Sequence, residues 1–139
     1  MPEESTAPVL VELTRQVIDA GNRRDLDAVM SLYAPDVVWE SLDGLGVFDG
    51  ATAVRGFLGD WLSSYEVFNI EPDEVLDMGG GITFVVGRQG GRLLGAAGRV
   101  EQRSAWAMTW KHGLAVHIIA GMDIDEARAV AERLAEERG

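Results

Sequence analysis

The 139-residue chain has a length and composition typical of one globular domain, spanning residues 1–139. Its net charge of −11 repels phosphate backbones and anionic lipid surfaces, so neither nucleic acid nor a membrane is expected as a partner. No apolar run approaches the roughly 20 residues that span a bilayer, and the absence of cysteine excludes disulfides and thiolate chemistry. Residues 1–7 lack the pattern of a secretory signal and are expected to form a loose tail, which makes the cytoplasm the expected compartment.

The first half of the chain predicts three helices and one short strand. Apolar residues recur at helical spacing over 8–20, and Asp25 can cap a second helix that continues to Tyr33, before Pro35. Residues 37–39 favour a strand. After a stretch rich in turn residues, positions 54–65 carry the clearest helical pattern of the chain.

In the second half the period of the apolar residues changes from helical to alternating, which predicts strands. These are expected over 67–78, 82–88, 99–110 and 116–122. Pro72 should bend the first strand, and the glycines within 89–92 should turn or bulge the second. Asp123 or Asp125 can cap a final helix over 124–139. This order predicts an α+β fold in which a strongly curved, mixed or antiparallel sheet packs on the N-terminal helices, with the helices gathered on one side.

Strand parity predicts which side chains face the concave side of the sheet, because successive residues point to opposite faces. In the strand 99–110, the face that carries Trp106 and Trp110 must be inside. An aromatic row is more often ordinary core than a ligand pocket, but the open end of a curved sheet is hard to fill, and scattered polar groups among apolar ones are typical of small-molecule sites. The residues expected to bind a ligand are Trp39, Ser41, Phe57, Trp61, Tyr65, Phe84, Arg88, Gln102, Trp106, Met108, Ile118, Ala120 and Met122.

The opposite, outer face of the sheet carries small or apolar residues that suit close packing of two sheets. They are Ala105, Ala107, Thr109, Ile119 and Gly121. We therefore expect a homodimer formed through this face.

Three segments carry a resemblance to a known family. GNRRDLDAVMSLYAPDVVWES at 21–41, FDGATAVRGFLGDWL at 48–62 and WAMTWKHGLAVHIIAGMDIDEA at 106–127 resemble the SnoaL-like, ketosteroid-isomerase-like branch of the nuclear-transport-factor-2-like superfamily. The resemblance implies a cone-shaped, cystatin-like α+β fold, dimeric through the outer sheet face, with a pocket inside the cone. It leaves the chemistry open, since the superfamily includes isomerases, cyclases, epoxide hydrolases and proteins that only bind.

The residues that catalyse in those relatives are absent at the matching positions. The alignment places Ser41 at the isomerase base, Val17 at its tyrosine and Trp106 at its acidic donor. A serine such as Ser41 cannot abstract a proton unaided at neutral pH. Val17 cannot replace the tyrosine hydroxyl, and the indole of Trp106, which can only donate, cannot replace the carboxylic acid. Of the arginine and two aspartates of epoxide hydrolases, only Arg88 falls near the expected position. Neither standard reaction is expected.

Asp43 remains as the candidate catalytic base. Its position in a glycine-bearing loop favours a role as a turn residue, and a role as a base at the pocket rim is the second interpretation. Glu40 is a weaker candidate, His112 is expected to be exposed in a hairpin, and His117 has the parity of the outer face. We expect no metal and no cofactor, because the two separated histidines have no carboxylate at ligand spacing.

Three functions stay open at this point. The first is a pocket protein that binds a small apolar molecule of aromatic or polyketide-like character. The second is an acid/base enzyme with Asp43 as base and Tyr65, Gln102 or Arg88 as partner of the oxyanion. The third is a dimeric interaction domain in which the pocket is imperfect core. A concavity filled by tryptophan side chains would remove the basis of the first two.

Overall fold

The computed structural model describes residues 6–138, which form four helices and six strands. They are α1 (Thr6–Asn22), α2 (Leu26–Ser31), β1 (Tyr33–Ser41), β2 (Val47–Asp49), α3 (Ala51–Ser63), β3 (Tyr65–Gly79), β4 (Ile82–Leu93), β5 (Val100–Lys111), β6 (Leu114–Gly121) and α4 (Ile124–Arg138). Of the predicted tail, residues 1–5 lie outside the described residues, whereas residues 6–7 belong to α1 and are not a loose tail. Among the described helices, none is long and apolar enough to cross a membrane.

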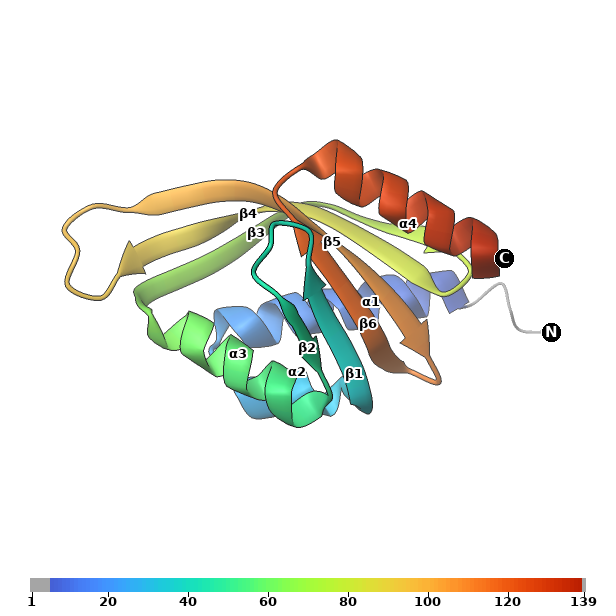
Figure 1. Ribbon diagram of the computed structural model, residues 1–139, viewed down its shortest axis with the longest axis horizontal. Coiled ribbons are helices and arrows are strands. Elements are labelled where there is room, and N and C mark those ends of the chain that lie inside the picture. The colour runs from blue at the N-terminus through green and yellow to red at the C-terminus, as the bar shows by residue number, and fades with distance from the viewer. Residues whose placement is uncertain (1–5, 139) are drawn as a thin grey trace.

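The six strands form one mixed sheet in the order β2-β1-β6-β5-β4-β3. β1 and β6 run parallel, and every other neighbouring pair is antiparallel. Helices α1, α2 and α3 cover one face of this sheet, and α4 packs on the other face (Figure 1). The predicted α+β fold, with a mixed sheet packed on the N-terminal helices, is confirmed. The expectation that all helices lie at one side is wrong, because α4 packs on the other face.

The helix boundaries follow from capping residues and from one proline. The Asp25 side chain accepts a hydrogen bond from Ala28 N–H (3.0 Å) at the start of α2, and Asp123 does the same for Glu126 N–H (3.0 Å) at the start of α4. The predicted continuation of the second helix to Tyr33 is wrong, because Tyr33 begins β1. A proline disfavours helical backbone in the preceding residue, so Pro35 requires the helix to end before Ala34; α2 ends at Ser31, with Leu32 as its C-cap.

The long strands β3 and β4 bend without breaking. The register of β3 against β4 shifts between Pro72 and Glu74, as expected near a proline. The turn or bulge predicted within 89–92 is not found in β4, because the strand continues to Leu93 and pairs with β5 without a register shift through Gly91. Gly91 has φ +150°, and a Cβ there would collide with the carbonyl oxygen of Val67 on β3. Glycine is therefore required at this position for the close approach of two strands.

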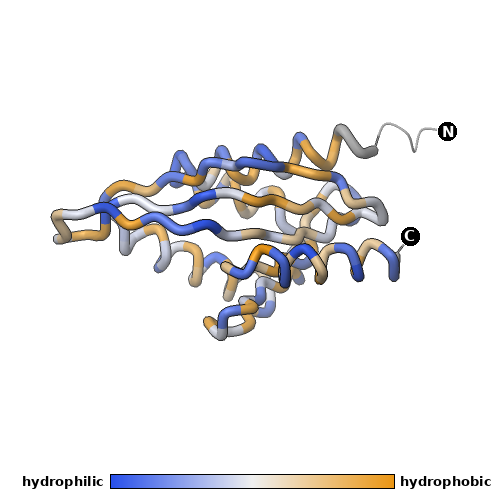
Figure 2. The backbone as a smooth tube through the Cα atoms, turned by 90° about the horizontal axis from the view of Figure 1, so that it is seen from above, coloured by the Kyte–Doolittle hydropathy of each residue, from blue (hydrophilic) through white to orange (hydrophobic). Residues whose placement is uncertain are grey.

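The two faces of the sheet belong to two separate apolar clusters. Met108 and Ile118 pack with α1 and α2, and their neighbours Ala107 and Ile119 pack under α4. Along α1, which leads from the N-terminus in Figure 2, hydrophobic and hydrophilic stretches alternate, as expected for a helix with one buried side. Successive residues of the central strands β5 and β6 therefore point alternately toward α1 and α2 and toward α4.

The parity predicted for β4 is wrong by one residue. Val85 pairs with Trp106 and shares its face, whereas Phe84 pairs with Ala107 and lies under α4. The cause is that residues 82–86 are buried on both faces, so the sequence shows no alternation there. Arg88 shares the parity of Phe84 and forms ion pairs with Asp73 (3.2 Å) and Glu71 (3.4 Å).

Helix α4 also covers the face at which a dimer was expected. Ala105, Ala107 and Ile119 are buried in the cluster that includes Ala127 and Ala131 of α4. These residues are therefore packed against α4 and cannot form the contact predicted for them. A homodimer as such stays a prediction.

A buried chain of hydrogen bonds joins α1 to β4 and β5. Thr14 Oγ1 donates to the carbonyl of Leu10 (2.8 Å), and Trp110 Nε1 donates to Thr83 Oγ1 (3.0 Å). Because the single hydroxyl proton of Thr14 is already used, the 2.9 Å contact between the two threonines has Thr83 as its donor. Each polar atom in this chain therefore has a partner, and the position of α1 over the sheet is fixed.

We expect Thr83→Val to lower the free energy of unfolding by about 2 to 4 kcal/mol, because it leaves the Trp110 indole N–H and an acceptor site of Thr14 unpaired in the interior. Urea unfolding measures this change. Thr52→Val is the matched control, since Thr52 is exposed on α3, and we expect an effect within about 0.5 kcal/mol. Equal stability of the two variants would contradict the role given to this chain of bonds.

Candidate functional site

A cavity of about 360 Å³ lies between the concave face of the sheet and helices α1, α2 and α3. Its wall is mostly apolar. The helices contribute Val17, Ile18, Gly21, Leu26, Val29, Phe57, Leu58, Trp61 and Leu62, and the strands and following loops contribute Tyr33, Trp39, Ser41, Asp43, Leu45, Phe68, Ile70, Val85, Gln89, Gln102, Ser104, Trp106, Met108, Ile118, Ala120, Gly121 and Met122.

Tryptophan side chains line this space without filling it. Trp39, Trp61 and Trp106 belong to the wall, whereas Trp110 is buried elsewhere and bonds to Thr83. The concavity is therefore not filled by tryptophan side chains, and the two functions that require a pocket keep their basis.

The structure brings most of the predicted site residues together at this wall. They are Trp39, Ser41, Asp43, Phe57, Trp61, Gln102, Trp106, Met108, Ile118, Ala120 and Met122. Three predicted residues lie outside it: Phe84 and Arg88 because of the parity of β4, and Tyr65 because the helix ends at Ser63. The Tyr65 ring packs between Trp61 (6.0 Å) and Phe68 (5.1 Å). A role of the lining residues in ligand binding stays a prediction.

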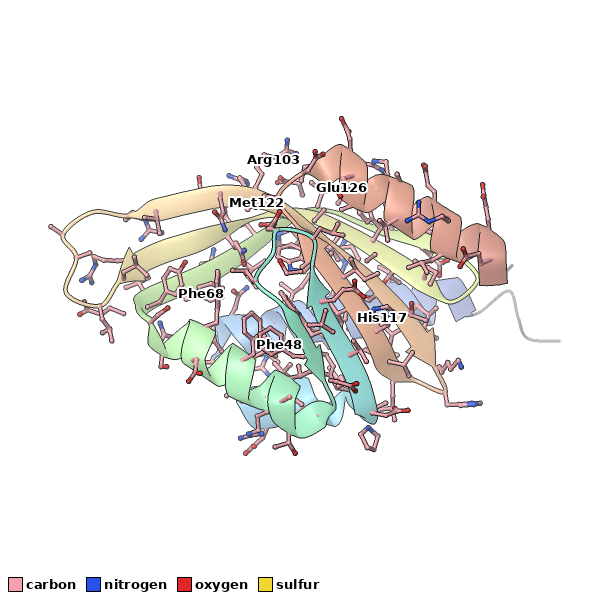
Figure 3. The ribbon with its side chains drawn as sticks, viewed as in Figure 1. Phe48, Phe68, Arg103, His117, Met122 and Glu126 are labelled. Carbon is pink, nitrogen blue, oxygen red and sulfur yellow. The ribbon has the colours of Figure 1, made fainter. Side chains whose placement is uncertain are left out.

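Aromatic rings follow one another along the α3 side of the cavity. Phe48 stacks on Phe57 at 4.2 Å between ring centroids, and Phe57 also contacts Trp39 (4.6 Å) and Trp61 (6.3 Å). In Figure 3, Phe48 and Phe68 lie near α3, whereas Arg103 and Glu126 lie towards the beginning of α4. Contacts between rings stabilise each ring's orientation, so this side offers a firm apolar surface to a flat molecule.

The polar groups of the wall are few and, with one exception, neutral. Gln89 Nε2 donates to Ser104 Oγ (3.2 Å), and Gln102 is exposed beside them. No lysine, arginine or histidine belongs to the described wall, so Asp43 carries its one charge. Such a wall suits a neutral molecule, because an anion would lose its hydration without gaining a cation.

Asp43 holds the loop after β1 against the end of β6. Its carboxylate accepts the amide of Met122 at 3.1 Å (Oδ2) and 3.4 Å (Oδ1), and its own amide donates to Ser41 Oγ (2.9 Å). The side chain is exposed at the rim of the cavity, beside Leu45. This geometry supports the predicted turn role and leaves a role as base as a hypothesis.

The other ionisable candidates lie away from the cavity. His117 Nε2 contacts Glu40 Oε1 at 2.7 Å, and neither residue belongs to the cavity wall. His112 is exposed in the turn between β5 and β6. Within residues 6–138, no group of three or more histidine, aspartate or glutamate side chains could hold a metal ion.

Among the wall residues that sequence reasoning missed, Val85, Gln89 and Tyr33 have an identifiable cause. Val85 and Gln89 were missed because β4 shows no alternation. Tyr33 was placed in a helix, although Pro35 was a signal for extended backbone. Burial raises the pKa of the Tyr33 phenol above its ordinary value, so this hydroxyl stays protonated at neutral pH.

Comparisons with known proteins agree with this architecture. The family model for the SnoaL-like domain matches residues 14–118. No curated protein matches the chain by sequence. The match to the SnoaL-like domain confirms the family resemblance predicted from the sequence.

Solved structures share the fold at low sequence identity. An NTF2-like protein of unknown function from Burkholderia pseudomallei K96243 is 24% identical, with a TM-score of 0.73, over 91% of this chain and 97% of that chain. A protein named as a SnoaL-like polyketide cyclase from Jannaschia sp. CCS1 is 14% identical, with a TM-score of 0.72, over 91% and 93%. An LEH-like epoxide hydrolase from M. tuberculosis is 14% identical, with a TM-score of 0.72, over 92% of each chain.

Proposed function

Because this chain belongs to the SnoaL-like domain family, we propose that its cavity binds a small, largely apolar molecule. The observation that carries the proposal is the open cavity of about 360 Å³, whose wall is apolar and aromatic. This volume falls within the range of about 300 to 1,000 Å³ that is usual for small-molecule pockets.

The wall also favours a class of ligand. The rings of Trp39, Phe57 and Trp61 offer flat surfaces, which suit a planar ring system. The net charge of −11 and a wall without cations disfavour anions. We therefore propose a neutral aromatic or polyketide-like molecule, a class that the similarity to a protein named as a polyketide cyclase supports.

A second candidate is an enzyme that performs acid/base chemistry on such a molecule with Asp43 as base. The observation in its favour is that the one charged side chain of the described wall lies at the mouth of the cavity. Two of its three expected partners, Tyr65 and Arg88, lie outside the wall, which leaves Gln102. Binding without turnover is therefore the function we propose first.

Equilibrium dialysis against ethylnaphthalene, a flat hydrocarbon, tests the proposed binding. We expect saturable binding of one molecule per chain, because the cavity is apolar and open. Absence of saturable binding up to the solubility limit of the probe would contradict the proposal.

We expect Asp43→Asn to leave the dissociation constant of ethylnaphthalene within about twofold of the wild type, because the probe has no group for a carboxylate to meet. The free energy of unfolding should fall by less than about 1 kcal/mol, since the amide oxygen of asparagine can still accept the Met122 N–H. Dialysis and urea unfolding measure both quantities.

The same variant separates the two candidate functions. Under the enzyme hypothesis, Asp43→Asn abolishes any turnover that the wild type shows on ketone or epoxide substrates, whereas Asp60→Asn, an exposed change on α3 outside the cavity wall, retains it. Turnover that survives in Asp43→Asn would exclude Asp43 as the base.

A further inference from the structure

Three polar side chains gather on neighbouring strands of the cavity wall. They are Gln89 of β4 and Gln102 and Ser104 of β5, and we refer to them as the glutamine cluster. Gln89 and Gln102 are direct partners in the antiparallel pairing of these strands, and such partners have Cβ atoms about 5 Å apart on one face. Gln89 Nε2 also donates to Ser104 Oγ at 3.2 Å. Arg103, labelled in Figure 3, lies between Gln102 and Ser104 in the sequence and marks the place of the cluster on β5.

The row of β5 side chains that faces the cavity runs from its apolar end to the solvent. Met108 is buried in the cluster with α1 and α2, Trp106 is partly buried, and Gln102 is exposed. Ser104 lies between Trp106 and Gln102 in this row and is 3% exposed. The glutamine cluster thus occupies the solvent end of an otherwise apolar row, within reach of a substituent on a ring bound beside Trp106.

The bond between Gln89 and Ser104 leaves hydrogen-bonding capacity unused on both side chains. A carboxamide has two donor hydrogens and an acceptor oxygen, and a hydroxyl has one donor hydrogen and two acceptor sites. Among the described residues, the 3.2 Å contact is the one hydrogen bond that these two side chains make. Whichever of the two is the donor in it, the pair keeps at least one donor and one acceptor for a ligand.

The side chains next to Gln89 on β3 and β4 are apolar or absent. Its partner on β3 is Ile70, and the residues two positions away on β4 are Gly87 and Gly91. A ligand that covers the glutamine cluster must therefore satisfy these polar groups itself, because an unpaired polar group enclosed in an apolar pocket is costly. This penalty disfavours a ligand that meets the cluster with a hydrocarbon surface.

We propose that the glutamine cluster binds a hydroxyl group on a neutral ring ligand, so that hydroxylated aromatic molecules are the preferred ligand class. A hydroxyl both donates and accepts, which matches carboxamide and hydroxyl groups held side by side, whereas an ether oxygen only accepts. A carboxylate is disfavoured because the described wall contains no cation. This inference rests on the proposed function, since it concerns a ligand of the same cavity.

Two probes of equal size test the inference by equilibrium dialysis. Naphthol carries a hydroxyl that stays protonated at neutral pH, and methylnaphthalene has a methyl group in its place. We expect Gln89→Met to weaken the binding of naphthol by about three- to tenfold, the effect of one hydrogen bond, and not to weaken that of methylnaphthalene. Gln102→Met, a change at an exposed position, should show the same selectivity.

Gln16→Met is the matched control, because Gln16 is the third glutamine of the chain and lies exposed on α1, outside the cavity wall. We expect it to change neither affinity. In nitrogen–proton NMR spectra of the wild type, naphthol should shift the side-chain amide signals of Gln89 and Gln102 more than methylnaphthalene does, and neither probe should shift those of Gln16. Equal shifts by the two probes would overturn the inference.

The outcomes of the binding experiment separate the two proposals. If neither probe binds the wild type, the proposed function fails and this inference fails with it. If both probes bind and Gln89→Met changes neither, or weakens both equally, the inference alone is overturned. Methoxynaphthalene, which can accept but not donate, should lose less affinity than naphthol in Gln89→Met, and an equal loss would contradict the assignment of a hydroxyl. Selective weakening of naphthol supports the inference.

Discussion

Replacing Phe84 by alanine is expected to lower the free energy of unfolding by about 3 to 5 kcal/mol, the usual cost of removing a buried phenylalanine ring. Phe84 is 0% exposed and lies between the sheet and α4. The guanidinium of Arg128 lies 4.9 Å from its ring centroid and adds a cation–π contact. Urea unfolding measures the loss.

The same Phe84→Ala variant should bind ethylnaphthalene as the wild type does, under conditions in which both remain folded. The ring lies on the α4 side of the sheet and not at the cavity. Phe57→Ala is the matched change on the cavity wall and should weaken the probe. If Phe84→Ala were the variant that loses binding, the assignment of the two sheet faces would be wrong.

Trp106→Ala is expected to weaken ethylnaphthalene binding by about tenfold or more, because it removes the largest ring of the central strands from the wall. Trp106 lies on β5 between Val85 of β4 and Ala120 of β6. Its side chain is only partly buried, so the loss of stability should be smaller than for Phe84→Ala. Equilibrium dialysis and urea unfolding give the two numbers.

Trp110→Phe is the control for Trp106→Ala. Trp110 is buried, lies outside the cavity wall and donates to Thr83, so its replacement should cost stability and leave probe affinity unchanged. Unchanged probe binding in Trp106→Ala would remove the indole from the site. Equal loss of binding in both variants would indicate a general loosening of the core.

The parts of the fold with one buried and one exposed side could be predicted from the sequence. The helix that contains Phe57 and Trp61 and the strand that contains Trp106 and Met108 have clear periodicity, and most of their predicted residues line the cavity. In β4, residues 82–86 are buried on both faces. Which β4 side chains face the cavity is decided only by the pairing with β5 and the packing of α4, and both depend on contacts between residues distant in sequence.

The position of α4 shows a similar limit. Its acidic start and apolar side were visible in the sequence, but an amphipathic helix does not reveal which face of a sheet it will cover. The contact residues predicted for a dimer were misassigned for this reason, since Ala105 and Ala107 suit a helix as well as a second sheet. At the site, the missing isomerase residues were evident, whereas Tyr33 required knowledge of where α2 ends.

The most direct test of the account is the location of the bound probe. In nuclear Overhauser spectra of the wild type with ethylnaphthalene, we expect contacts from the naphthalene protons to the methyl groups of Met108, Ile118 and Val85, which line the cavity. We expect none to Ala107 and Val86, which pack under α4. Contacts to the second pair and not to the first three would place the probe outside the cavity and contradict the proposed function.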